Sequence, residues 1–152
     1  MERLSDYYIA SSHNTYLEED QLFGKTNIDC YINFLTYFGG GCIEIDIIRI
    51  EYNKEINNLD IIVGHYMTLT CELYLSDIFK KIKEFLENNN FKKLGPIIIS
   101  FDNKYISNKN EYKLFWDMFY EYFEPYLYLN FEDNNLYIKD IIGKNINKME
   151  TI

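Results

Sequence analysis

Short apolar runs rich in β-branched residues alternate along this chain with longer segments whose apolar residues recur at helical spacing. The runs predict strands at residues 7–10, 42–48, 59–64, 97–101 and 144–148. The longer segments predict amphipathic helices at residues 29–38, 76–87 and 110–124, with Asp29 and Ser76 as N-caps of the first two. Because the strands are apolar almost throughout, both sheet faces should be covered, as in an α/β protein with a parallel sheet or barrel. The connection at residues 49–58 fits this arrangement badly, because it is short for a helical crossover.

The sequence is acidic, with 152 residues and a formal net charge of −9. Its hydrophobic content of 47% predicts one globular domain, or part of one, rather than a disordered chain. The negative charge argues against nucleic acid as a partner. No apolar run is long enough for a transmembrane helix or a secretory signal, and the three cysteines form no disulfide framework. We therefore expect a cytoplasmic protein.

Polar side chains interrupt or follow the predicted strands. Glu44 and Asp46 lie two positions apart on one apolar strand, so the period of two places both carboxylates on the same face. Four more polar residues stand just after strands, namely His13, Asn14, His65 and Asp102. Ligands of α/β folds bind beyond the carboxyl ends of the strands, which predicts a site here. For Glu44 and Asp46 alone, the solvated face of an ordinary strand is an equally good interpretation.

The chemical types in this set indicate a metal-dependent reaction. Three carboxylates and an amide are all oxygen donors, which suit calcium or magnesium better than zinc. Two histidines beside such a cation suit phosphoryl chemistry, in which the imidazoles donate to the phosphate and to the leaving group. The residues alone therefore predict a metal-dependent enzyme that acts on phosphodiesters.

Five segments carry a resemblance to a known family, and they occur in the family's order. They are LSDYYIASSHNTYL (4–17), GCIEID (41–46), VGHYMTLT (63–70), PIIISFDN (96–103) and DIIGKNINK (140–148). In these segments the chain resembles the catalytic X region of eukaryotic phosphoinositide-specific phospholipase C. The first segment is long and highly specific, and the matches together cover nearly the whole chain.

The resemblance implies a fold, a reaction and a role for each site residue. The expected fold is a partial (β/α) TIM-type barrel, the X half only, with about five parallel strands and their helices. The implied reaction cleaves phosphatidylinositol 4,5-bisphosphate into diacylglycerol and inositol 1,4,5-trisphosphate, through attack of the inositol 2-hydroxyl on phosphorus. His13 would stabilise the phosphate, His65 would protonate the leaving oxygen, and Glu44 or Asp102 would accept the proton of the hydroxyl. Calcium would be held by Asn14, Glu44, Asp46 and Asp102, and a ring phosphate by Lys148.

The chain also departs from the family pattern. Asp102 stands where the family has glutamate, and Glu150 stands where a second phosphate-binding lysine is expected. We expect residues 1–152 to form the X-box region without a Y half or regulatory domains, peripheral at membranes, with a phosphoinositide lipid and a Y-half segment as partners. One alternative is a catalytically inactive remnant or interaction module of the same fold. A lower-ranked alternative is a glycerophosphodiester phosphodiesterase, whose H-R-G opening is absent here.

Overall fold

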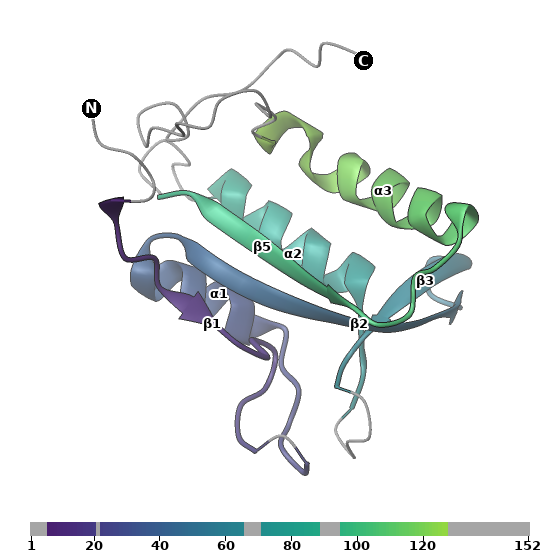
Figure 1. Cartoon of the computed structure of the whole chain (residues 1–152), viewed down its shortest axis with the longest axis horizontal. Coiled ribbons are helices and arrows are strands. Elements are labelled where there is room, and N and C mark those ends of the chain that lie inside the picture. The colour runs from purple at the N-terminus through teal and green to yellow at the C-terminus, as the bar shows by residue number, and fades with distance from the viewer. Residues whose placement is uncertain (1–5, 21, 66–70, 89–94, 128–152) are drawn as a thin grey trace.

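A computed structural model describes residues 6–20, 22–65, 71–88 and 95–127 of the chain (Figure 1). The strands are β1 (Ser11–Ser12), β2 (Gly41–Asn53), β3 (Asn58–Val63), β4 (Leu73–Tyr74) and β5 (Ile97–Asn103). The helices are α1 (Asp29–Phe38), α2 (Leu75–Asn88) and α3 (Lys109–Phe123), followed by a 3₁₀ turn at Glu124–Tyr126. The strand predicted at 144–148 lies outside the described residues.

The sheet is built around β2, which has three neighbours. It pairs in parallel with β1 and β5 and antiparallel with β3, which in turn pairs antiparallel with β4. The prediction that all the strands are parallel is therefore wrong, and the sheet is mixed. The reason is the short connection between β2 and β3, where Asn57 adopts a left-handed φ of 53°. A turn of this length joins antiparallel strands only, whereas the helices α1 and α2 precede the parallel strands and keep the fold in the α/β class.

Several element ends differ from their predicted positions. The first strand is β1 at Ser11–Ser12 rather than at 7–10, and β5 continues past its predicted end to Asn103. Asp29 is not the N-cap of α1; that position is Ile28, and the backbone N–H of Asp29 donates to Asn27 Oδ1 at 2.9 Å. Ser76 does not cap α2 either. It lies buried in the first turn, and its hydroxyl donates to Asp60 Oδ2 at 2.5 Å.

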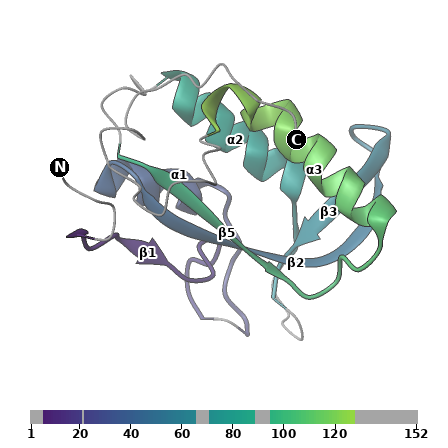
Figure 2. The same ribbon diagram turned by 45° about the horizontal axis from the view of Figure 1, so that its top comes forward.

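The hydrophobic core lies between one face of the sheet and the helices. Ile43, Ile45 and Ile47 alternate along β2 and are at most 1% exposed, which defines the helix-covered face. Phe79 of α2 is the centre of an aromatic cluster, with its ring 6.3 Å from Phe101 of β5 and 4.9 Å from Phe123 of α3, both edge to face. Figure 2 shows α2 and α3 lying together over the sheet. Residues that alternate with the isoleucines, including Glu44 and Asp46, therefore face the other side.

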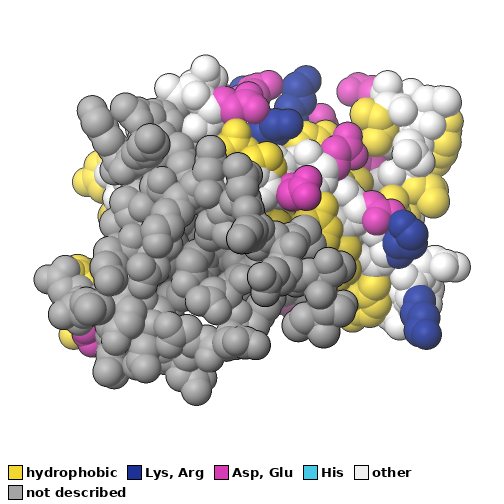
Figure 3. All heavy atoms as spheres, turned by 90° about the horizontal axis from the view of Figure 1, so that it is seen from above, with side chains coloured by type: hydrophobic (Ala, Val, Ile, Leu, Met, Phe, Trp, Pro, Cys, Tyr) yellow, Lys and Arg dark blue, Asp and Glu magenta, His cyan; other side chains and the backbone are white. Residues whose placement is uncertain are grey.

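The helix-covered side presents a mixed surface. Figure 3 shows Asp and Glu side chains scattered among Lys, Arg and apolar side chains over the part of this face that is coloured by residue type. That part of the face therefore carries no continuous basic patch. Within the described ranges, no helix combines the length and apolarity needed to cross a bilayer.

The start of β2 depends on the backbone freedom of Gly41. Its φ is 127°, and a Cβ atom there would stand 2.8 Å from the carbonyl oxygen of Ala10 and 3.0 Å from the Phe34 ring. We expect Gly41→Ala to lower the free energy of unfolding by about 3 kcal/mol, because it combines backbone strain with a contact that cannot relax. Gly39→Ala is the matched control. Its φ is 67°, and an added Cβ atom would meet nothing within 4 Å, so the free energy of unfolding should fall by only about 1 kcal/mol. Equal urea midpoints for the two variants would contradict this prediction.

Candidate active site

The pairing of β2 with β5 sets two carboxylates side by side. Asp46 of β2 is the register partner of Asp102 of β5, and Glu44 is the partner of Ser100. Residues paired in parallel strands point to the same face, so Glu44, Asp46 and Asp102 share the face opposite the isoleucine core. The period-two argument from the sequence placed Glu44 and Asp46 on one face, and the register of β5 adds Asp102 to the same surface.

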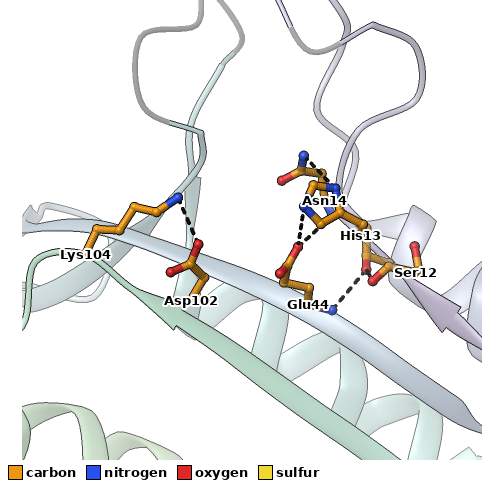
Figure 4. Close-up of polar contacts among 7 residues, drawn as sticks. Ser12, His13, Asn14, Glu44, Asp102 and Lys104 are labelled. Atoms are coloured by element: carbon orange, nitrogen blue, oxygen red, sulfur yellow. Dashed lines mark hydrogen bonds and ion pairs between the residues drawn. The ribbon is translucent and has the colours of Figure 1, made fainter.

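The loop after β1 brings His13 and Asn14 onto Glu44 (Figure 4). The backbone N–H of Asn14 donates to Glu44 Oε2 at 3.0 Å, and His13 Nε2 lies 3.5 Å from the same oxygen. The side-chain amide of Asn14 contacts His13 Nδ1 at 3.2 Å. Because an amide nitrogen only donates, Nδ1 accepts and the ring proton is assigned to Nε2, facing Glu44. Asn14 reaches this position with a left-handed φ of 48°, which asparagine tolerates better than most residues.

Thr15 fastens this loop to β2, and the sequence analysis did not single it out. Its Oγ1 accepts the backbone N–H of Glu44 at 3.2 Å and donates to the carbonyl of Ser12 at 3.3 Å. Thr15 is buried, as is Asn14, whereas His13 on the same loop is exposed. A threonine directly after two polar candidates, with a hydroxyl able to bond three residues back, was the available signal.

Two buried oxygen atoms in the site have no hydrogen-bond partner among the described residues. They are Asn14 Oδ1 and Asp46 Oδ2. Burial raises the pKa of Asp46, and the neighbouring Glu44 carboxylate raises it further. An ionised Asp46 therefore sits in an unfavourable negative environment, and a bound cation would relieve both the repulsion and the lack of partners.

His65 reaches the same region by an unexpected route. The hairpin returns β3 along β2, and the backbone N–H of Gly64 donates to the carbonyl of Asp46 at 3.1 Å. His65 follows directly, and its charge counts among the influences that lower the pKa of Asp46. The rule about carboxyl ends of parallel strands does not apply to β3. His65 is nevertheless brought to Asp46, because an antiparallel strand ends beside the middle of its partner.

Asp102 forms an ion pair that the sequence analysis missed. Lys104 directly follows β5, and its Nζ lies 2.8 Å from Asp102 Oδ2 (Figure 4). Hydrogen bonding to Asp102 raises the pKa of Lys104, so its ammonium form is favoured. Glu44 and Asp102 thus have separate partners, and the described part of the chain holds no ready group of three His, Cys, Asp or Glu residues able to hold a metal ion. Lys148 and Glu150 lie outside the described residues.

The fold and the site define an α/β domain with carboxylates and two histidines on one face of its sheet. The sequence profile of the family described as phosphatidylinositol-specific phospholipase C, X domain, matches residues 1–144. The chain belongs to this family, as the five matching segments indicated. Its membership decides against the glycerophosphodiester phosphodiesterase alternative.

Named relatives and solved structures agree with this membership. The chain is 39% identical over 83 residues to 1-phosphatidylinositol 4,5-bisphosphate phosphodiesterase gamma plc-3 of Caenorhabditis elegans, covering 54% of the chain and 6% of that protein. It is 35% identical over 101 residues to the delta-1 enzyme of Rattus norvegicus, covering 66% and 12%. The crystal structure of L. pealei PLC21 superposes with a TM-score of 0.69 at 28% identity, over 92% of the chain and 18% of that structure. The chain thus spans a small fraction of the length of these proteins.

Proposed function

We propose that this chain is the catalytic X half of a calcium-dependent phosphoinositide phospholipase C that cleaves phosphatidylinositol 4,5-bisphosphate to diacylglycerol and inositol 1,4,5-trisphosphate. The observation that carries the proposal is the grouping of His13 and Asn14 on the Glu44 carboxylate, beside a buried Asp46 with an oxygen that has no partner among the described residues. The names of the relatives, which are phosphodiesterases for this lipid, support the choice of substrate.

The donor atoms on this face fit calcium. Asn14 Oδ1 and Asp46 Oδ2 are buried oxygens without partners among the described residues, and Glu44 of β2 and Asp102 of β5 add carboxylates. Calcium accepts six to eight oxygen ligands in irregular geometry, including water, so a loosely arranged set of this kind suits it better than magnesium. When bound, calcium would supply charge stabilisation and would lower the pKa of the inositol 2-hydroxyl.

The side chains divide the remaining chemistry between them. Glu44 accepts the proton of the 2-hydroxyl as that oxygen attacks phosphorus, with Asp102 as the alternative acceptor. His13, whose side chain is 80% exposed, is free to turn its Nε2–H to a phosphate oxygen. His65 gives a proton to the diacylglycerol oxygen as the bond from phosphorus to that oxygen breaks. The product is a cyclic inositol phosphodiester, which water opens, and Lys148 is proposed to contact a ring phosphate.

A second half of the barrel is part of the proposal. Within the described residues, β1 and β5 each pair on one edge only, both with β2. Unpaired edges invite further strands, and a Y-half segment would continue the sheet towards a closed (β/α) barrel. The proposed localisation is the cytoplasmic face of a membrane, because the proposed substrate is a membrane lipid.

The experiment is a thermal melt with and without millimolar calcium. A site filled at one hundred times its Kd should stabilise the fold by about 2.7 kcal/mol, which is about 5–10 °C for a domain of this size. Asp46→Asn should abolish this calcium-induced shift. The same variant should stabilise the calcium-free protein by about 1 kcal/mol, because it removes a charge that burial and the neighbouring Glu44 carboxylate disfavour.

Asp117→Asn serves as the matched control. Asp117 lies on α3 in an exposed ion pair with Lys113, away from the site, and the substitution makes the same change in charge. It should keep the full calcium shift. An absent shift in the wild type, or an equal shift in Asp46→Asn, would remove calcium from the proposal.

A further inference from the structure

The site carries a cation of its own, the ammonium group of Lys104. Lys104 directly follows the end of β5, and its Nζ lies 2.8 Å from Asp102 Oδ2, on the face that carries Glu44 and Asp46. Asp102 is also the register partner of Asp46, the buried carboxylate whose Oδ2 has no hydrogen-bond partner in the described part of the chain. The positive charge of Lys104 therefore lies at one end of the set of carboxylates, beside Asp102, while His13 and Asn14 lie at the other end, beside Glu44 (Figure 4).

The influence of Lys104 extends beyond its direct partner. Its charge lowers the pKa of Asp46, and in return Asp46 and Glu44 help to raise the pKa of Lys104. Both Lys104 and Asp102 are partly exposed, with side chains 50% and 39% accessible. Their ion pair is therefore weak and exchangeable, as surface pairs are, and a stronger cation can displace it.

We infer that Lys104 acts as a tethered competitor of calcium. It neutralises Asp102 in the calcium-free protein and weakens calcium binding to the three carboxylates of the site. The inference rests on the proposed function and concerns how that site is regulated. To use Asp102 as a ligand, calcium has to displace the ammonium group, which then remains nearby as a like charge. A unit charge about 6 Å from a divalent ion in a water-like dielectric weakens binding about tenfold.

The alternative to this competitor role is a purely structural role for Lys104. In that case the pair would fix the end of β5, and removing it would lower stability without changing calcium affinity. The two roles differ in one measurable quantity, the calcium Kd. They also differ in the calcium-induced rise in melting temperature, which becomes larger in Lys104→Met under the competitor role and stays unchanged under the structural role.

The test is calorimetric titration of calcium into four forms of the chain at constant pH and ionic strength. Lys104→Met removes the charge and keeps a long side chain, and we expect its calcium Kd to fall about tenfold. Lys104→Arg keeps the charge and should bind calcium within about twofold of the wild type. Lys113→Met is the control, because Lys113 forms an exposed pair with Asp117 on α3 and its loss changes the net charge equally. It should leave the Kd unchanged.

The outcomes separate this inference from the proposed function. Tighter binding in Lys104→Met only, with a larger calcium-induced rise in its melting temperature, supports the competitor role. Equal Kd values in Lys104→Met and the wild type overturn it and leave the calcium site intact. A similar gain in Lys113→Met also overturns it, because the effect would then be one of net charge. No calcium binding in any form overturns both the inference and the calcium site on which it rests.

Discussion

Replacing Asp60 with alanine is expected to bring the domain close to unfolding. Asp60 of β3 is fully buried, and its Oδ2 accepts from Asn53 Nδ2 at 3.0 Å and from Ser76 Oγ at 2.5 Å. Its Oδ1 accepts the backbone N–H groups of Ile61 at 2.7 Å and of Ser76 at 3.3 Å. One carboxylate thus joins the β2–β3 hairpin to the first turn of α2. Alanine would leave buried donors unpaired and would lower the free energy of unfolding by about 4 kcal/mol. For most domains the whole free energy of unfolding is about 5–15 kcal/mol.

The measurement is urea unfolding followed by circular dichroism, with Asp77→Ala as the matched control. Asp77 is also in the first turn of α2, next to Ser76, but burial and then the nearby Asp60 raise its pKa. Its charge is therefore unfavourable where it stands, which offsets its attraction to the helix N-terminus. We expect Asp77→Ala to change the free energy of unfolding by less than about 1 kcal/mol. A similar decrease in the free energy of unfolding in the two variants would show that the hydrogen bonds of Asp60 do not stabilise the domain in this way.

The helices were the most predictable part of this fold. The segment predicted at 29–38 is α1 with the same bounds, and α2 and α3 differ from their predictions by one residue at each end. Their apolar residues recur at helical spacing and are the residues that the core buries, including Ile78, Phe79 and Phe115. Periodicity is a local property, so the sequence carries it completely.

Properties set by distant partners were not predictable in the same way. Ser76 has the residue type of an N-cap, yet its hydroxyl is used by Asp60, which comes from a hairpin that no local pattern connects to α2. The antiparallel pairing of β2 and β3 did leave a local signal, namely a connection too short for a crossover. The general preference for parallel sheets in α/β proteins outweighed that signal, and the resulting prediction was wrong.

The residue types of the candidate site could be predicted, but its contacts could not. His13, Asn14 and Glu44 were selected by type and position, and the structure brings them together on one carboxylate. Lys104 was missed because it lies outside both the predicted strand and the observed β5, so no strand period predicts the direction of its side chain. Its contact with Asp102 depends on the path of the backbone after β5 ends at Asn103, and the strand period does not describe that path.

A polypeptide of these 152 residues alone is expected to cleave phosphatidylinositol 4,5-bisphosphate at least about 1,000-fold more slowly than an equal amount of the rat delta-1 relative. The reason is that several electrostatic contacts, each worth about 100-fold or more in rate, would be weakened at once. Asp102 is 39% exposed and His13 80% exposed, so water reaches the groups that would act on the phosphate. Charge interactions in such an open site are several-fold weaker than in a closed one. A net charge of −9 adds no attraction to an anionic membrane.

The assay is release of inositol phosphates from mixed vesicles containing the lipid, with calcium present and the rat delta-1 relative as the positive control. Within the described residues β1 and β5 each pair on one edge only, which gives the physical reason for the deficit, since a sheet that pairs on both edges would enclose the site and exclude water. A Y-half segment that restores activity when added in trans should therefore also protect the backbone amides of β5 from hydrogen exchange. Rapid, calcium-dependent cleavage by the monomeric 152-residue chain would refute this view, because it would show that the carboxylates and histidines on this face need no enclosure to act.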